Sequence, residues 1–166
     1  MTVAALITWI ITAVGGLYLL AIWLIEYDVS APGGAVSQLP RTVITGHVLL
    51  ATTGLVVWIV YLIVDRYMLA LIALSTLFAV VLLGLTMLGR WIMVRRTLAS
   101  ALRASASAMD GASVSVGASA RDSLGTARAE TPAEGHFPVP VVLGHGVLAG
   151  ATLTLVLLSV LGLGGS

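Results

Sequence analysis

The chain has 166 residues, of which 59% are hydrophobic and 9% are charged, and its mean hydropathy is +1.10. A water-soluble domain of this size could hardly cover such a composition with polar surface, so the sequence predicts a protein whose solvent is the lipid bilayer. The chain has no cysteine, which excludes disulfides and thiolate metal sites. Its net charge is +1, and it has no aromatic-basic platform or recognised nucleic-acid motif, so we expect no nucleic-acid partner.

Four apolar runs are long enough to cross a hydrocarbon core, which takes about 20 helical residues. They cover residues 3–25, 42–64, 68–94 and 138–162. We therefore expect an all-α fold, an integral membrane four-helix bundle that forms a single domain. The first run exceeds the roughly 7–15 apolar residues of a signal-peptide core, although cleavage after Ala31 stays as an alternative.

The links between the runs differ in length and composition. The second and third runs are separated only by Asp65, Arg66 and Tyr67, so they must form antiparallel neighbours. The third link, residues 97–135, is rich in Ala, Ser and Gly and has no aromatic residue. It cannot build a core, and we expect a mostly disordered cytoplasmic loop. The alanines of residues 97–108 favour a helical start that continues the third span.

The arginines predict the orientation in the membrane. Arg66 stands alone on one side, and seven arginines lie on the other: Arg41, Arg90, Arg95, Arg96, Arg103, Arg121 and Arg128. Because basic residues are enriched in cytoplasmic loops, this second side is predicted to be cytoplasmic and both termini non-cytoplasmic. The chain lacks lysine and asparagine, which indicates a GC-rich bacterial coding bias. We therefore expect the inner (plasma) membrane of a bacterium.

An internal repeat is the most informative pattern. With one constant offset, the second and fourth runs share Val43/Val141, Gly46/Gly144, His47/His145, Leu50/Leu148, Ala51/Ala149 and Leu55/Leu153. With another, the first and third runs align Gly16, Leu17, Leu20 and Trp23 with Gly84, Leu85, Leu88 and Trp91. The two matches together suggest two pseudo-repeated helical hairpins, related by an axis along the membrane normal.

The repeated histidines are the candidate site. His47 lies about six residues inside from Arg41, and His145 about seven inside from Pro138, so both sit roughly 9–11 Å into their helices. An ionisable residue in a membrane span is costly and is a functional candidate by default. Two imidazoles on opposed helices could hold an octahedral iron from both faces of a porphyrin. We interpret His47 and His145 as the metal ligands of a haem b.

Small residues and a cation surround this pair in the sequence. The residues that could leave room for a flat ring are Gly46, Ala51 and Gly54 in the second run and Gly144, Gly146, Ala149 and Gly150 in the fourth. Arg90, beside Trp91, could meet a haem propionate. Arg41, Arg95 and Arg96 are alternates for this role.

Each of these residues also has a structural interpretation. A membrane histidine can simply hydrogen-bond a neighbouring helix, and small residues commonly mediate close helix packing. Arg90 could be an interfacial anchor, Trp23 and Trp91 belt residues at the membrane surface, and His136 a surface residue. All carboxylates lie outside the apolar runs, which argues against proton-coupled transport through an intramembrane acid.

With His47, His145 and their small neighbours, the chain resembles four-helix membrane cytochromes of b type, including quinone-linked anchor subunits. It also looks like small four-span proteins of GC-rich bacteria. The first resemblance implies that the chain binds one haem and exchanges electrons with quinone or a partner subunit. It implies that the chain acts either on its own or as part of a larger membrane complex. Larger bundles of this type carry two histidine pairs, whereas this chain has one. A non-redox transporter, or an assembly or scaffold subunit with structural histidines, is the competing expectation, and enzymatic activity and homo-oligomerisation stay open.

Overall fold

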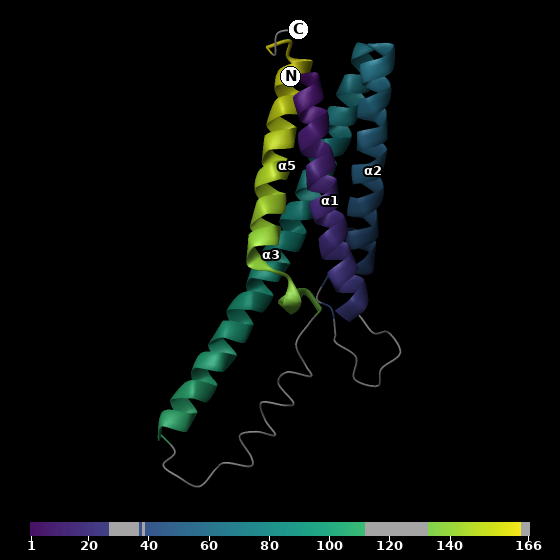
Figure 1. Ribbon diagram of the computed structural model, residues 1–166. Coiled ribbons are helices and arrows are strands. Elements are labelled where there is room, and N and C mark those ends of the chain that lie inside the picture. The colour runs from purple at the N-terminus through teal and green to yellow at the C-terminus, as the bar shows by residue number, and fades with distance from the viewer. Residues whose placement is uncertain (27–36, 38, 112–132, 164–166) are drawn as a thin grey trace.

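The computed structural model describes residues 1–26, 37, 39–111 and 133–163, and every regular element in that part of the chain is helical. The elements are α1 (Thr2–Glu26), α2 (Arg41–Val64), α3 (Tyr67–Gly111), the short 3-10 helix η1 (Ala133–His136) and α5 (Val139–Val160). The four long helices lie side by side in one bundle (Figure 1). The predicted all-α four-helix bundle is confirmed.

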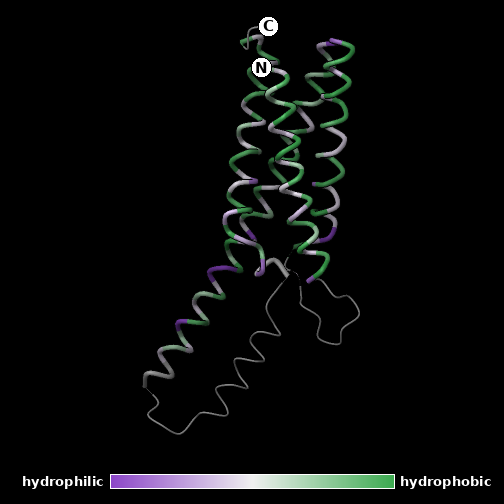
Figure 2. Tube along the Cα trace, in the orientation of Figure 1, coloured by the Kyte–Doolittle hydropathy of each residue, from purple (hydrophilic) through white to green (hydrophobic). Residues whose placement is uncertain are grey.

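The surface of the bundle is apolar along its length. Each of the four long helices is long and apolar enough to cross a membrane, and many large apolar side chains face outward, among them Ile63, which is 77% exposed. Apolar colouring predominates along the bundle, with hydrophilic residues mainly toward its two ends (Figure 2). A continuous apolar surface of this extent would associate in water, whereas lipid solvates it, so the chain is a multi-pass membrane protein.

The bundle has an Arg41 end and an Arg66 end. At the Arg41 end, α1 ends while α2 and α5 begin. At the Arg66 end, α1 starts and α5 finishes near the tight α2–α3 turn (Figure 1). Asp65 closes that turn in the left-handed conformation, with φ of 51°, and its N–H donates to the Tyr61 carbonyl over 2.8 Å. The side of the membrane that each end faces stays a prediction.

Helix α3 is much longer than a membrane span. It has 45 residues, about 68 Å of helix at 1.5 Å per residue, and it projects beyond the bundle at the Arg41 end (Figure 1). Its last part covers residues 97–111, so the helical start predicted for residues 97–108 is present and extends three residues further. Residues 112–132 of the predicted disordered loop lie outside the described residues, and its last three residues, 133–135, belong to η1.

The helices form a ring in which α2 packs along α3, α1 along α5, and α3–α5 and α1–α2 contacts close the circle. Helices α2 and α5 therefore occupy opposite corners. One core, at the Arg66 end, contains Ala5, Trp9, Trp58, Ala70, Ala73, Leu77 and Val156. A second core, at the Arg41 end, contains Trp23, Leu39, Ile44, Trp91 and Phe137. The level of His47 and His145 lies between the two cores.

Candidate cofactor site

The two histidines meet across the bundle. His47 comes from α2 and His145 from α5, each about one and a half turns inside its helix at 3.6 residues per turn. Their ring centres are 6.4 Å apart, and the ring planes are tilted by 55°. Since α2 and α5 occupy opposite corners, the imidazoles reach one another through the interior, as predicted from the shared depth of the two residues.

Each imidazole is held by a backbone carbonyl of the helix next to its own. The Nδ1 atom of His47 lies 3.1 Å from the Val80 carbonyl oxygen on α3, and the Nδ1 atom of His145 lies 3.0 Å from the Thr12 carbonyl oxygen on α1. A carbonyl oxygen can only accept, so Nδ1 carries the proton and donates in both rings. The lone pair then resides on Nε2, and among the described residues neither Nε2 atom has a hydrogen-bond partner.

Two glycines make room for these rings. A Cβ atom added to Gly16 would lie 3.0 Å from Cε1 of His145, and one added to Gly84 would lie 3.3 Å from Cε1 of His47. Gly16 is one helical turn after Thr12, and Gly84 is one turn after Val80. The missing side chain in each case opens access to the carbonyl that accepts from the histidine.

The two halves of the site correspond position by position. Thr12 and Gly16 contact His145 in the way that Val80 and Gly84 contact His47. Gly16 and Gly84 are matched in the alignment of the first and third runs, but they were not among the residues predicted for the site. The signal was present in that alignment, because a glycine shared by both odd helices faces the shared histidine of the even ones. The internal repeat itself stays a prediction.

The other predicted small residues contribute less contact. Gly144 has open space where a Cβ would lie, and a Cβ on Gly46 would meet only Leu83, at 3.9 Å. Ala51 and Ala149 are half-buried. Gly54 is different, since its Cβ would lie 3.1 Å from the Trp9 ring, and so it serves the core at the Arg66 end.

Trp23 and Trp91 lie in the interior of the bundle at the Arg41 end. Trp23 and Trp91 are each only 7% exposed and pack in the same core, so the interpretation as membrane-surface belt residues is wrong. The indole N–H of Trp23 donates to the Ser37 hydroxyl over 3.0 Å. The Nε1 atom of Trp91 is buried and has no hydrogen-bond partner among the described residues.

Arg90, Arg95 and the third histidine, His136, lie at the surface of the bundle. Arg90 is exposed on α3, near the Arg41 end. The guanidinium carbon of Arg95 lies 5.5 Å from the centre of the Trp91 ring, a cation–π contact. His136 is 43% exposed at its side chain and lies 3.8 Å from the Glu26 carboxylate, in agreement with its prediction as a surface residue.

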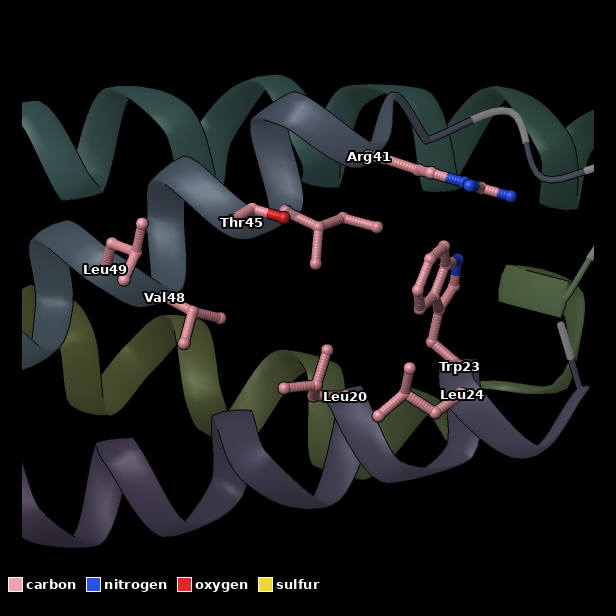
Figure 3. Close-up of a pocket in the computed structure, with 8 residues that line it drawn as sticks. Leu20, Trp23, Leu24, Arg41, Thr45, Val48 and Leu49 are labelled. Atoms are coloured by element: carbon pink, nitrogen blue, oxygen red, sulfur yellow. The ribbon is translucent and has the colours of Figure 1, made fainter.

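A cavity of about 460 Å³ lies between α1 and α2, the pair with the sparsest packing in the ring. Its walls are mainly apolar, and its lining consists of Leu20, Trp23, Leu24, Arg41, Ile44, Thr45, Val48 and Leu49. Arg41 and Trp23 lie toward one end of it, and the Thr45 hydroxyl lies further along α2 (Figure 3). Because Ile44 and Val48 flank His47 on α2, this α1–α2 cavity adjoins the histidine level.

Comparisons with known proteins add no relative to these observations: no family model, no curated protein and no solved structure matches the chain.

Proposed function

We propose that the chain is a single-haem membrane protein of b type, in which His47 and His145 bind the iron from opposite faces of the porphyrin. The observation that carries this proposal is the pairing of two imidazoles whose Nδ1 atoms are fixed by carbonyls and whose Nε2 atoms are left for a ligand. A hydrogen bond from the second ring nitrogen is the usual way in which a protein orients a metal-binding histidine.

The spacing of the rings fits this role. Two imidazoles that bind one metal ion from opposite sides each place a nitrogen about 2 Å from the metal, which sets the ring centres about 6 Å apart. The ring centres of His47 and His145 are 6.4 Å apart. The observed separation of the ring centres is therefore close to the separation that such ligation requires.

The donor set favours a tetrapyrrole over a bare metal ion. No group of three or more His, Asp or Glu side chains within residues 1–26, 37, 39–111 and 133–163 could hold a metal. Two protein ligands are too few for the common structural sites of zinc or other free ions, which take four or more. A porphyrin brings four nitrogens of its own and requires only the two axial ligands that this pair supplies.

The competing interpretation, in which both histidines are purely structural, accounts for the hydrogen bond of Nδ1 but not for the unpartnered Nε2 atom. A structural imidazole in the interior of a membrane bundle should satisfy both nitrogens, because an unpaired polar atom in an apolar environment is costly. Here one nitrogen of each ring is bonded and the other is not. Neither Nε2 atom is among the fully buried polar atoms of the described residues, so each is reachable by a ligand, which favours the ligand role.

Quinone is the electron partner that the α1–α2 cavity fits best. The cavity combines apolar walls with the side chains of Arg41 and Thr45, and these groups suit a lipophilic molecule with an oxygen-bearing head. Its α2 wall includes Ile44 and Val48, which lie at the depth of His47, so a head group bound there would lie at the same level of the bundle as the proposed haem. A partner subunit on the Arg41 end is the second candidate.

Optical spectroscopy tests the haem proposal directly. The protein, expressed with sufficient haem and purified in detergent, should show the sharp Soret and α bands of a low-spin, six-coordinate haem after reduction with dithionite. Binding should saturate at one haem per chain. Folded protein that stays colourless under these conditions would contradict the proposal and favour the transporter or scaffold alternative.

A further inference from the structure

Trp91 carries a buried donor that the bundle itself does not use. The indole is 7% exposed, and its Nε1 atom is sealed from solvent without a partner in the described part of the chain. An unpaired N–H in an apolar interior costs free energy that an apolar side chain of similar shape would avoid. The equivalent indole on α1, Trp23, has a partner in the Ser37 hydroxyl at 3.0 Å.

Trp91 belongs to the core at the Arg41 end, which lies next to the level of His47 and His145. It follows Gly84 by seven residues on α3, which is two helical turns and about 10 Å along the same face. In the core it packs with Ile44, which lies one turn before His47 on α2. The indole therefore lies between the histidine level and the end of the bundle where Arg41 and Arg95 are found.

Positive charge accompanies the donor. The Arg95 guanidinium lies over the Trp91 ring, 5.5 Å from its centre, and Arg41 begins α2 at the same end. A carboxylate that enters an apolar interior must be hydrogen-bonded and paired with a cation, or its desolvation cost is prohibitive. An N–H donor beside a guanidinium meets both conditions.

We infer that the indole N–H of Trp91 donates a hydrogen bond to a carboxylate of the bound tetrapyrrole. This inference rests on the haem proposal and deepens it, because it selects tetrapyrroles that carry carboxylate side chains and orients those side chains toward the Arg41 end. Trp91 is thus a binding residue for the periphery of the ring, separate from the two metal ligands.

The chain contains a matched control. Trp58 is fully buried, at 0% exposure, and its Nε1 atom is also without a partner among the described residues. It lies in the core at the Arg66 end, eleven residues beyond His47 and so about 16 Å along α2. Replacing either tryptophan by phenylalanine removes an orphaned indole N–H from a core, but only Trp91 is on the side proposed for the carboxylates.

The experiment compares two cofactors in three proteins: wild type, Trp91→Phe and Trp58→Phe, each as the full chain in detergent. Equilibrium binding of protohaem and of its dimethyl ester, which has no carboxylate, is followed in the Soret band. We expect Trp91→Phe to weaken protohaem binding roughly tenfold or more, as for a lost hydrogen bond to a charged group, and to leave ester binding unchanged. Trp58→Phe should alter the binding of both cofactors by the same small factor.

The outcomes separate this inference from the haem proposal. If wild type binds neither cofactor, both fail. Suppose instead that all three proteins bind protohaem with the low-spin spectrum. If Trp91→Phe then weakens the binding of protohaem and of the ester equally, or weakens the binding of neither, the proposed role of Trp91 is wrong while the haem proposal stands.

A measurement on wild type covers the case in which Trp91→Phe does not fold. In protein with ¹⁵N-labelled indoles, the N–H signal of Trp91 should move downfield in the reduced protohaem complex relative to the reduced ester complex. Ring-current effects are shared by the two complexes and cancel in this difference. The Trp58 signal should coincide in both complexes, and a coincident Trp91 signal would overturn the inference.

Discussion

Gly16 and His145 are in the tightest of the described glycine contacts: a Cβ atom on Gly16 would lie 3.0 Å from Cε1 of the imidazole. Gly16→Ala should therefore displace the His145 ring from the Thr12 carbonyl and destabilise the bundle by about 1–3 kcal/mol, as overpacking does in other cores. Gly84→Ala, with 3.3 Å available at His47, should cost less.

The measurement for this prediction is thermal or denaturant unfolding in detergent. Gly144→Ala is the control, because the space beside Gly144 is open, and it should leave stability unchanged or raise it by up to about 1 kcal/mol, the usual gain of Gly→Ala in a helix. An equal loss for Gly144→Ala and Gly16→Ala would show that general glycine effects, and not the histidine contact, set the stability.

Replacement of either histidine should remove the low-spin haem spectrum, since a site with two axial imidazoles needs both. We expect His47→Ala and His145→Ala each to bind haem weakly or in a high-spin form, and added imidazole to restore part of the low-spin band. His136→Ala should leave the spectrum unchanged, because that residue is exposed at the surface. A normal spectrum in His145→Ala would rule out the paired ligation.

Filling the α1–α2 cavity should slow electron exchange with quinone without changing the haem. Leu20→Trp places a bulky ring in the cavity, and it should lower the rate of haem reduction by a soluble quinol analogue at least several-fold with unchanged optical bands. The matched control is Leu143→Trp, at an exposed position of α5. Equal rates in both variants and wild type would place quinone elsewhere.

The long link between α3 and α5 should be dispensable for the bundle. Removing residues 105–126 takes away the end of α3, which projects beyond the other helices (Figure 1), together with residues that cannot form a core. Membrane insertion, thermal stability and cofactor content should be retained. Loss of the folded bundle would show that this segment has a structural role.

The predicted orientation can be checked with reporter fusions. A fusion after Ser166 should be active only with a reporter that works outside the cytoplasm, and a fusion at Gly117 only with a cytoplasmic one, because the excess of arginines lies on the side of the long link. Cytoplasmic activity at Ser166 would reverse the orientation.

Much of the architecture follows from the sequence alone. Four apolar runs of membrane length dictate four helices, because a backbone in lipid must satisfy its hydrogen bonds internally. The three-residue link at Arg66 leaves α2 and α3 no arrangement but an antiparallel pair. The shared depth of His47 and His145 follows from their distance to the helix starts. These features depend on local composition and on chain length, which one sequence records directly.

The contacts that shape the candidate site depend on helix rotation and pairing, which apolar sequence specifies weakly. Helices that are apolar all round show no preferred buried face, so only packing decided that Gly16 meets His145, that Gly84 meets His47 and that the carbonyls of Thr12 and Val80 accept from the rings. For the same reason, the sequence predicted Trp91 to be a belt residue at the membrane surface, although in the structure it lies on the buried face of α3. The sequence determined which residue types are present at each depth, and the tertiary structure decided which of them face one another.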